Sequence, residues 1–317
     1  MTSTPAASGN DDIERARTAL RKIPLTREAA YAASITRLGG LTNLVFAAST
    51  DAGDFCLRLP GAGTEAYIDR GAEAANARAA ALSGVSPEVE HFGADGIMLT
   101  RLIAGAVTMS PAAFRERDGA VERAARAFRQ LHDEAPAFAS RFDLFRKIDE
   151  YRALLRTLGT SLPEGYDDLV VAADEVRDAL DARPAVLRPC HCDPLCENFL
   201  DAAGRMWIVD WEYSGQNDPM WDLGDLSVEA GFDADMERRM MEAYFGRPAT
   251  AAEFGRMAIY KAMCDLLWTL WGLIQHGNDN PADDFWAYAV NRFERCKRLM
   301  GDPVFEEYLD VTRSESS

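Results

Sequence analysis

The segment CHCDPLCENFL, residues 190–200, concentrates side chains that can do chemistry. Besides three cysteines it contains His191, Asp193 and Asn198, and Asp210 follows after the apolar run WIV. One carboxylate can orient an attacking hydroxyl and accept its proton. An amide oxygen and a second carboxylate are hard ligands of the kind that Mg²⁺ prefers. The set therefore fits phosphoryl transfer from a nucleotide.

The cysteines offer other interpretations of the same segment. Zinc sites favour Cys pairs separated by two to four residues, often matched by a second, distant pair. Cys190 and Cys192 are separated by one residue, and no matching pair follows. A reactive thiol needs an activating base and exposure, and the sequence shows neither. We therefore expect buried packing residues and keep a zinc-dependent protein as an alternative.

The first third of the chain predicts a β-rich N-lobe over residues 11–103, after a small, polar tail over residues 1–10 that we expect to be disordered. A turn over TDAGD and the Asp95-Gly96 pair mark strand connections. The expected elements are a helix over 11–32, strands over 35–49 (broken at Gly39-Gly40) and 55–60, a helix over 66–82 and a hairpin over 89–103.

The remainder, residues 104–317, predicts a mainly helical C-lobe. Apolar residues recur at helical spacing from Val121 to Leu131, and further helices are expected over 143–158, 167–182, 254–275 and 283–300. Two short strands, 198–200 and 206–211, join at Ala203-Gly204 and carry the chemical segment. The prediction is an α+β, two-lobed fold with a cleft between the lobes.

The composition of the chain argues against some classes of binding partner. The chain has 317 residues and a net charge of -17, which argues against a broad nucleic-acid surface and against anionic lipid. No apolar run of about 18 residues and no secretory signal are evident, so no stable membrane association is expected. Six cysteines in a chain this long make no disulfide framework. We expect a cytoplasmic protein, and the sequence leaves monomer and homodimer open.

The motif series HCDPLCENFL, IVDWEY and DPMWDLGDL resembles the choline/ethanolamine kinase family, within the larger aminoglycoside phosphotransferase-like group of protein-kinase-like folds. In the N-lobe, ITRLGGLTNLVF, FCLRLPG and IDRGAEAANARA resemble the family's phosphate-covering hairpin, third strand and first helix. The similarity extends over residues 33–300 and is strongest in the C-lobe. Its matched positions there are His191, Asp193, Asn198, Asp210, Glu212, Tyr213, Asp218, Pro219 and Asp222.

The resemblance implies roles for the residues of the opening segment. Asp193 would be the catalytic base, and His191 would support the catalytic loop. Asn198 and Asp210 would bind Mg²⁺. ATP is the expected phosphoryl donor, although the sequence does not separate ATP from GTP.

The resemblance also implies a nucleotide-binding set in the N-lobe. Arg58 would hold the phosphates and pair with Glu73, with Glu65 as the alternative partner. Two glycines in the hairpin allow close backbone approach to phosphate. The nucleotide-binding residues are then Gly39, Gly40, Asn43, Arg58 and Glu73.

The segment DLLWTLWGLIQH carries a tryptophan pair. Trp268 and Trp271 are three residues apart and share a helix face. Such a pair is usually core, but in the family a similar segment lines the choline pocket. A quaternary ammonium has no N–H donors, so aromatic faces must attract it. The resemblance adds Tyr213, Tyr288 and Phe232 as further walls.

The leading hypothesis is therefore an ATP-dependent kinase that converts choline to phosphocholine, an enzyme type of phospholipid metabolism. Ethanolamine is the close alternative, because its ammonium donates hydrogen bonds and prefers carboxylate or carbonyl partners. A pocket without a carboxylate near the cation would favour choline. Thiamine, aminoglycoside or methylthioribose kinases share the catalytic motif but give no reason for the Trp pair. A non-catalytic binder of quaternary amines would have no use for Asp193, Asn198 and Asp210.

Overall fold

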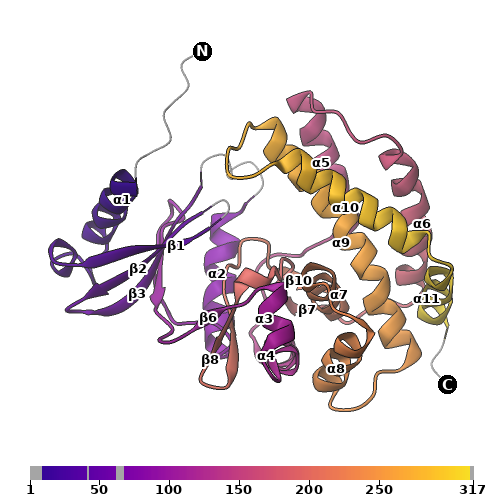
Figure 1. Cartoon of the computed structure of the whole chain (residues 1–317), viewed down its shortest axis with the longest axis horizontal. Coiled ribbons are helices and arrows are strands. Elements are labelled where there is room, and N and C mark those ends of the chain that lie inside the picture. The colour runs from indigo at the N-terminus through magenta and orange to yellow at the C-terminus, as the bar shows by residue number, and fades with distance from the viewer. Residues whose placement is uncertain (1–8, 41–42, 62–67, 315–317) are drawn as a thin grey trace.

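The computed structural model describes residues 9–40, 43–61 and 68–314. It shows a β-rich lobe joined to a mainly helical lobe (Figure 1), which confirms the predicted α+β, two-lobed fold. Residues 1–8 of the predicted tail lie outside the described residues, whereas residues 9 and 10 begin the first helix.

The N-lobe is built on a five-stranded antiparallel sheet in the order β1-β2-β3-β5-β4. The predicted helix over 11–32 ends at Lys22, because Pro24 lacks an N–H and disfavours helical geometry at the residue before it. The elements of this lobe are α1 (Gly9–Lys22), the short 3-10 helix η1 (Ala29–Tyr31), β1 (Ser34–Gly39), β2 (Leu44–Thr50), β3 (Gly53–Leu59), α2 (Arg70–Leu82), β4 (Val89–Phe92) and β5 (Met98–Arg101).

The side chains of strand β3 point alternately to the two faces of the sheet. Phe55 and Leu57 are fully buried in a small core that they share with Leu20 of α1. Because side chains alternate along a strand, Arg58 points to the opposite face. Strand β3 pairs with β2 on one side and β5 on the other, so Arg58 projects from the middle of the sheet.

Helix α2 connects the lobes and lies between the strands β1–β3 and the helical lobe in Figure 1. Its N-cap is Asp69, whose side chain accepts hydrogen bonds from the first turn. Ala77 and Ala80 belong to the large core of the C-lobe. The amide of Asn76 donates to the Ser214 carbonyl at 3.0 Å. This anchoring fixes Glu73, one turn earlier on α2, between the lobes.

The C-lobe is mainly helical, as predicted, but contains four helices that the sequence patterns did not identify: α3, α7, α8 and α11. Helix α7 was missed because every side chain from Met220 to Val228 is buried, which leaves no amphipathic period to read. The helices are α3 (Pro111–Glu116), α4 (Ala120–Glu134), α5 (Leu144–Leu158), α6 (Tyr166–Ala182), α7 (Pro219–Ala230), α8 (Ala234–Phe245), α9 (Ala251–Gly277), α10 (Phe285–Met300) and α11 (Pro303–Arg313).

Short strands surround the chemical segment. The predicted hairpin is present and turns at Ala203 and Gly204, which both have positive φ, but its second strand ends at Ile208 and not at Trp211. In a separate two-stranded sheet, Gly215 lies opposite Cys190. The strands are β6 (Val107–Thr108), β7 (Arg188–Cys190), β8 (Phe199–Ala202), β9 (Arg205–Ile208) and β10 (Gly215–Asn217). This pairing brings the residues before His191 next to those after Asp210.

Helix α9 is the central helix of the C-lobe. A capping box of Thr250 and Glu253 starts it. Its length and hydropathy would suffice to cross a membrane, which the sequence analysis did not anticipate, but 94% of its most apolar window is buried inside the protein. It therefore acts as a core helix and packs against α5, α7, α10 and α11.

Candidate active site

The catalytic loop after β7 is held in place from helix α7. Both carboxylate oxygens of Asp222 accept backbone hydrogen bonds, from the N–H of His191 at 2.7 Å and of Cys192 at 2.8 Å. The Trp221 indole donates to the Cys192 carbonyl at 3.1 Å. Cys192 has a φ of 67°, a conformation that costs energy for a residue with a Cβ. These contacts offset that cost and fix the path of the chain into Asp193.

The imidazole of His191 is fully buried and uses both ring nitrogens within the loop. Nδ1 accepts the Asp193 N–H at 3.3 Å, and Nε2 lies 2.9 Å from the Val209 carbonyl. This pattern assigns the proton to Nε2. Burial lowers the pKa of His191, so the ring is neutral near pH 7. His191 therefore positions the loop.

Asp193 presents a partly exposed carboxylate with no basic side chain within 4 Å among the described residues. Burial raises the pKa of Asp193 well above its usual range, and the Asp225 and Asp210 carboxylates raise it further. A carboxylate that holds a proton more tightly is a better proton acceptor during reaction. Asp193 is thus suited to take the proton from an attacking hydroxyl.

Asn198 and Asp210 lie side by side at the hairpin. The Asn198 carbonyl accepts the Val209 N–H at 2.9 Å. Its amide Nδ2 donates to the Asp193 carbonyl at 2.9 Å, which leaves Oδ1 as the available ligand atom. Asp210 has a φ of 70°, which turns the chain immediately after Val209. An amide oxygen and a carboxylate are hard donors, and this pair fits Mg²⁺.

An ion network joins the lobes next to Asp210. Arg58 is 3% exposed; its Nη2 donates to Glu73 Oε1, and its Nη1 donates to Asp210 Oδ1 at 2.8 Å. Arg70 Nη1 donates to Glu73 at 2.7 Å and to Glu212 at 2.6 Å. Burial disfavours the charged guanidinium of Arg58, but the Asp210 and Glu73 carboxylates outweigh that cost and raise its pKa. The network places a permanent positive charge beside the candidate metal ligands.

The hairpin between β1 and β2 is only partly described. Gly40 has a φ of 110°, and a Cβ there would lie 1.9 Å from the Asn43 carbonyl oxygen, so only glycine fits; Gly39 has open space around it. Asn43 is buried, and its Oδ1 accepts the Gly61 N–H at 3.1 Å. It therefore braces the hairpin against the segment after β3. Residues 41 and 42 at the tip, and the alternative Arg58 partner Glu65, lie outside the described residues.

Four of the predicted aromatic residues form two ring pairs, and each pair contains one tryptophan of helix α9. The Trp268 and Tyr213 ring centroids are 5.1 Å apart. The Trp271 ring lies 5.5 Å from Tyr288 and 5.6 Å from Phe285. The structure thus brings residues from β9–β10, α9 and α10 into one wall. Phe285 is an additional member that the sequence analysis missed.

Phe232 packs in a different group of aromatic rings. It follows Gly231, the left-handed C-cap of α7, which turns the chain away from the helix axis. Its ring packs 5.4 Å from Phe114, which in turn contacts Phe199 beneath the hairpin. Among the described residues it makes no ring contact with the other four aromatic residues, so the predicted pocket role of Phe232 finds no contact to support it.

Helix α7 contributes two acidic residues, Asp225 and Glu229, that the sequence analysis did not name. Asp225 Oδ2 accepts the Trp268 indole N–H at 3.2 Å. Glu229 accepts two hydrogen bonds from Arg292 of α10. The signal in the sequence was the spacing of Asp222, Asp225 and Glu229, which at three and seven residues places them on one helix face.

The cysteine-rich character of the loop reflects packing. Cys190, Cys192 and Cys196 are buried, free thiols. Burial raises the pKa of Cys190 and of Cys192 well above the usual range, so neither is a thiolate near pH 7. Within the described ranges, the three sulfur atoms do not converge on a common ligand group. Of the three, only Cys190 belongs to a group of potential metal ligands, with His132 and Asp222. The Asp222 carboxylate already accepts two hydrogen bonds from the backbone of the loop. The zinc alternative has no support in this geometry.

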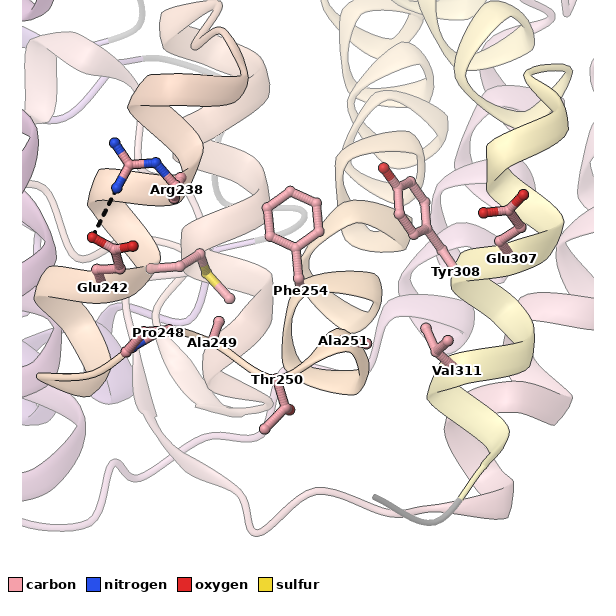
Figure 2. A pocket seen from close by; sticks show the side chains of 11 residues that line it. Arg238, Glu242, Pro248, Ala249, Thr250, Ala251, Phe254, Glu307, Tyr308 and Val311 are labelled. Atoms are coloured by element: carbon pink, nitrogen blue, oxygen red, sulfur yellow. Dashed lines mark hydrogen bonds and ion pairs between the residues drawn. The ribbon is translucent and has the colours of Figure 1, made fainter. Parts of the chain in front are cut away.

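A separate cavity of about 460 Å³ lies between α8, α9 and α11 (Figure 2). It contains none of the predicted site residues. Two of the charged groups on its wall, Arg238 and Glu242, are paired with each other at 2.9 Å, and Glu307 is the third. The rest of the wall includes Phe254, Tyr308 and Val311. It offers no chemistry comparable to the catalytic loop.

Comparison with known proteins assigns the chain to a family. The sequence matches the phosphotransferase enzyme family over residues 34–260. A choline/ethanolamine kinase family protein from Mesorhizobium loti is 56% identical, covering 95% of this chain and 99% of that chain with a TM-score of 0.87. The choline kinase LicA from Streptococcus pneumoniae is 26% identical over 84% and 93% of the two chains, with a TM-score of 0.72.

Two further comparisons bear on the ligands. A LicA structure in complex with AMP is 26% identical, covering 87% of this chain and 92% of that chain, with a TM-score of 0.70. Ethanolamine kinase 2 from Mus musculus is 26% identical over 288 residues, which are 81% of this chain and 73% of that protein.

Proposed function

The chain belongs to the phosphotransferase enzyme family and, within it, to the choline/ethanolamine kinases, and on that premise we propose that it phosphorylates choline. It is a small-molecule kinase. The proposed reaction converts ATP and choline to ADP and phosphocholine. The observation that carries it is the position of Asp193, which shares one loop with Asn198 and lies within electrostatic range of Tyr288 in the aromatic wall.

The residues around Asp193 have different roles in the proposed reaction. Arg58 would bind nucleotide phosphates, and Asn198 and Asp210 would hold Mg²⁺, which neutralises phosphate charge when bound. Asp193 accepts the proton of the substrate hydroxyl as that oxygen forms its bond to the γ-phosphorus. The bond between the γ-phosphorus and the bridging oxygen of ADP then breaks. Because Asp193 is held through His191 and Asn198, it is oriented before substrate arrives.

Choline fits the aromatic wall. A trimethylammonium group cannot donate hydrogen bonds, but indole and phenol rings attract it through their quadrupoles, with a contribution of about 0.5–2 kcal/mol. Trp268 and Tyr213 supply one edge-to-face pair and Trp271 and Tyr288 another. Similarity to the choline kinase LicA supports the same substrate.

Ethanolamine is the second candidate, and one observation favours it. The Asp225 carboxylate, which no sequence pattern singled out, lies against the Trp268 indole. The carboxylate gives an ammonium with N–H groups a direct acceptor. The similarity to mouse ethanolamine kinase 2 supports this candidate. For either substrate we infer a cytoplasmic enzyme whose product enters phospholipid metabolism.

A substrate panel tests the proposal. ADP release is measured with Mg²⁺-ATP and choline, ethanolamine, the mono- and dimethylated ethanolamines, thiamine or kanamycin. Asp193→Asn is the control, and it should abolish turnover while nucleotide still binds. Activity that rises with N-methylation supports choline, and activity that falls with it supports ethanolamine. Turnover by Asp193→Asn at the wild-type rate would remove Asp193 as the base.

A further inference from the structure

We propose that Asp225 is the counter-ion of the acceptor pocket and binds the positively charged nitrogen of the substrate through its free carboxylate oxygen, Oδ1. The inference deepens the proposed function and rests on it. It assigns to the pocket a preference for cations over neutral molecules of the same shape, which an aromatic wall alone would provide only weakly.

The two oxygens of Asp225 differ in their contacts. The side chain is 1% exposed. Oδ2 accepts the Trp268 indole N–H, whereas Oδ1 is buried and has no hydrogen-bond partner among the described residues. The Cys264 thiol lies close enough for the carboxylate to raise the pKa of Cys264, but a thiol is a weak donor. A buried carboxylate oxygen without a partner is costly, so a ligand that supplies positive charge would be stabilised there.

A second polar group nearby is also unused. The indole Nε1 of Trp271 is buried and has no acceptor among the described side chains and backbone groups. Trp271 is 7% exposed and stands next to Tyr288. An unused donor and an unused acceptor within one aromatic wall are typical of a site that receives a polar ligand.

The charged residues around Asp225 form ion pairs with one another and not with Asp225. Glu229 pairs with Arg292, and Asp265 pairs with Arg295, whose Nε donates to it at 2.7 Å. No basic side chain within the described ranges comes within 4 Å of Asp225. The four paired groups cancel, and Asp225 and Asp193 remain as the carboxyl groups of this cluster without a basic partner among the described residues. Asp193 takes the proton of the substrate hydroxyl, which leaves Asp225 for the substrate cation.

The position of Asp225 suits that role. Among charged neighbours it has the largest effect on the pKa of Asp193, and it also raises the pKa of Tyr288. It therefore lies within electrostatic range of both the base and the aromatic wall. In an amino alcohol of this class only two carbons separate the hydroxyl from the nitrogen. A hydroxyl at Asp193 therefore places the nitrogen within reach of both Asp225 and Trp268.

The test compares a cation with its neutral isostere. Binding of choline is measured by calorimetry against the alcohol in which a tert-butyl group replaces trimethylammonium. Asp225→Asn keeps an acceptor for the Trp268 N–H and removes only the charge. Asp178→Asn removes an exposed charge on α6 and serves as the matched control. The wild-type protein and Asp178→Asn should favour choline equally, and Asp225→Asn should lose roughly tenfold to 100-fold of that preference.

The outcomes separate this inference from the proposed function. If Asp225→Asn keeps the wild-type preference for choline over the neutral alcohol, the rings alone recognise the cation and the inference is wrong. If the wild-type protein phosphorylates none of the amino alcohols in the panel, the proposed function fails, and the inference fails with it. A loss of preference with unchanged affinity for the neutral alcohol supports the inference, because misfolding would weaken both ligands.

Discussion

At the scale of single residues, the acids around the catalytic loop differ in what satisfies them. Asp222 is saturated by backbone N–H groups, and Asp210 is paired with Arg58. Asp225 has one indole N–H, and Asp193 has no basic partner among the described residues. Asp222 is therefore structural, and Asp193 and Asp225 are available to ligands. Spacing in the sequence identified Asp193 and Asp210 but gave no reason to separate Asp225 from its neighbours.

The first prediction concerns Trp271. Trp271→Phe keeps an aromatic face, whereas Trp271→Leu keeps apolar volume without a π-system. We expect the choline KM to rise severalfold in Trp271→Leu and less in Trp271→Phe, because cation–π attraction contributes about 0.5–2 kcal/mol. Steady-state kinetics on both variants checks this. Equal KM values in the two variants would assign Trp271 to the core.

The second prediction is a pH dependence of choline binding. Burial raises the pKa of Asp225 well above its usual range. Below that raised pKa the carboxyl is neutral and attracts no cation, so affinity should strengthen as the pH rises through it. The groups that face Asp225 are Glu229 and Asp222 on α7, Cys264 and Trp268 on α9, Arg292 on α10 and Asp193 on the loop.

The Asp193→Asn background removes the catalytic base from this measurement. Calorimetric Kd values for choline are taken between about pH 5 and 9 in Asp193→Asn and in the double variant with Asp225→Asn. The double variant should bind more weakly and with a flatter profile. A flat profile in Asp193→Asn itself would show that Asp225 does not titrate with binding.

At the scale of elements, the sequence predicted the helices with a regular apolar period and the strands that carry a recognisable motif. The periodic helices α4, α5, α6, α9 and α10 and the β8–β9 hairpin were found this way. Helix α7 was not, because burial on all sides erases its period. The contact between Asp225 and Trp268 joins residues 43 positions apart, and no spacing rule links α7 to α9. The close packing of these helices therefore had to come from the structure.

The third prediction tests how tightly α10 must approach α9. A Cβ on Gly272 would lie 2.6 Å from Tyr288 Cδ1, and a Cβ on Gly255 would lie 2.6 Å from Val311 Cγ2 of α11. Both glycines are in α9 and both Gly→Ala variants should lose stability by about 1–3 kcal/mol. Only Gly272→Ala should raise the KM for choline, because it displaces Tyr288 from the aromatic wall.

Chemical denaturation and steady-state kinetics on the two variants separate packing from binding. Gly255→Ala is the matched control, since it crowds the same helix to the same degree on the side that faces α11. A KM for choline that rises equally in both variants would mean that general loosening, and not the position of Tyr288, sets substrate affinity.

At the scale of the whole molecule, the lobes are joined near the site by helix α2 and by the Arg58 network. Helix α2 buries Ala77 and Ala80 in the C-lobe core, and the Arg58 network reaches Asp210 across the cleft. The family resemblance supplied the pairing of Arg58 with Glu73. The contact with Asp210 was not predicted, because it spans 152 positions and depends on how the lobes meet.

The fourth prediction follows from this connection. Arg58→Ala leaves the buried Glu73 carboxylate and the partly exposed Asp210 carboxylate without their shared guanidinium. Removing one partner of a buried ion pair costs about 3–5 kcal/mol, and nucleotide affinity should fall as well. Arg101→Ala is the control, since Arg101 is exposed on β5 of the same sheet. Its one ion pair in the described part of the chain is with Glu90, which contributes about 0–1 kcal/mol, and its contact with the Phe55 ring adds about 0.5–1 kcal/mol.

Urea denaturation gives the two free energies of unfolding, and calorimetry gives the affinity for ATP. Lowering the pH should narrow the difference between Arg58→Ala and the wild type. Burial, the largest influence, raises the pKa of both Glu73 and Asp210, so in the variant these carboxyls take up protons readily as the pH falls and their uncompensated charge disappears. Arg58→Ala and Arg101→Ala with equal unfolding free energies would show that the network does not hold the lobes together.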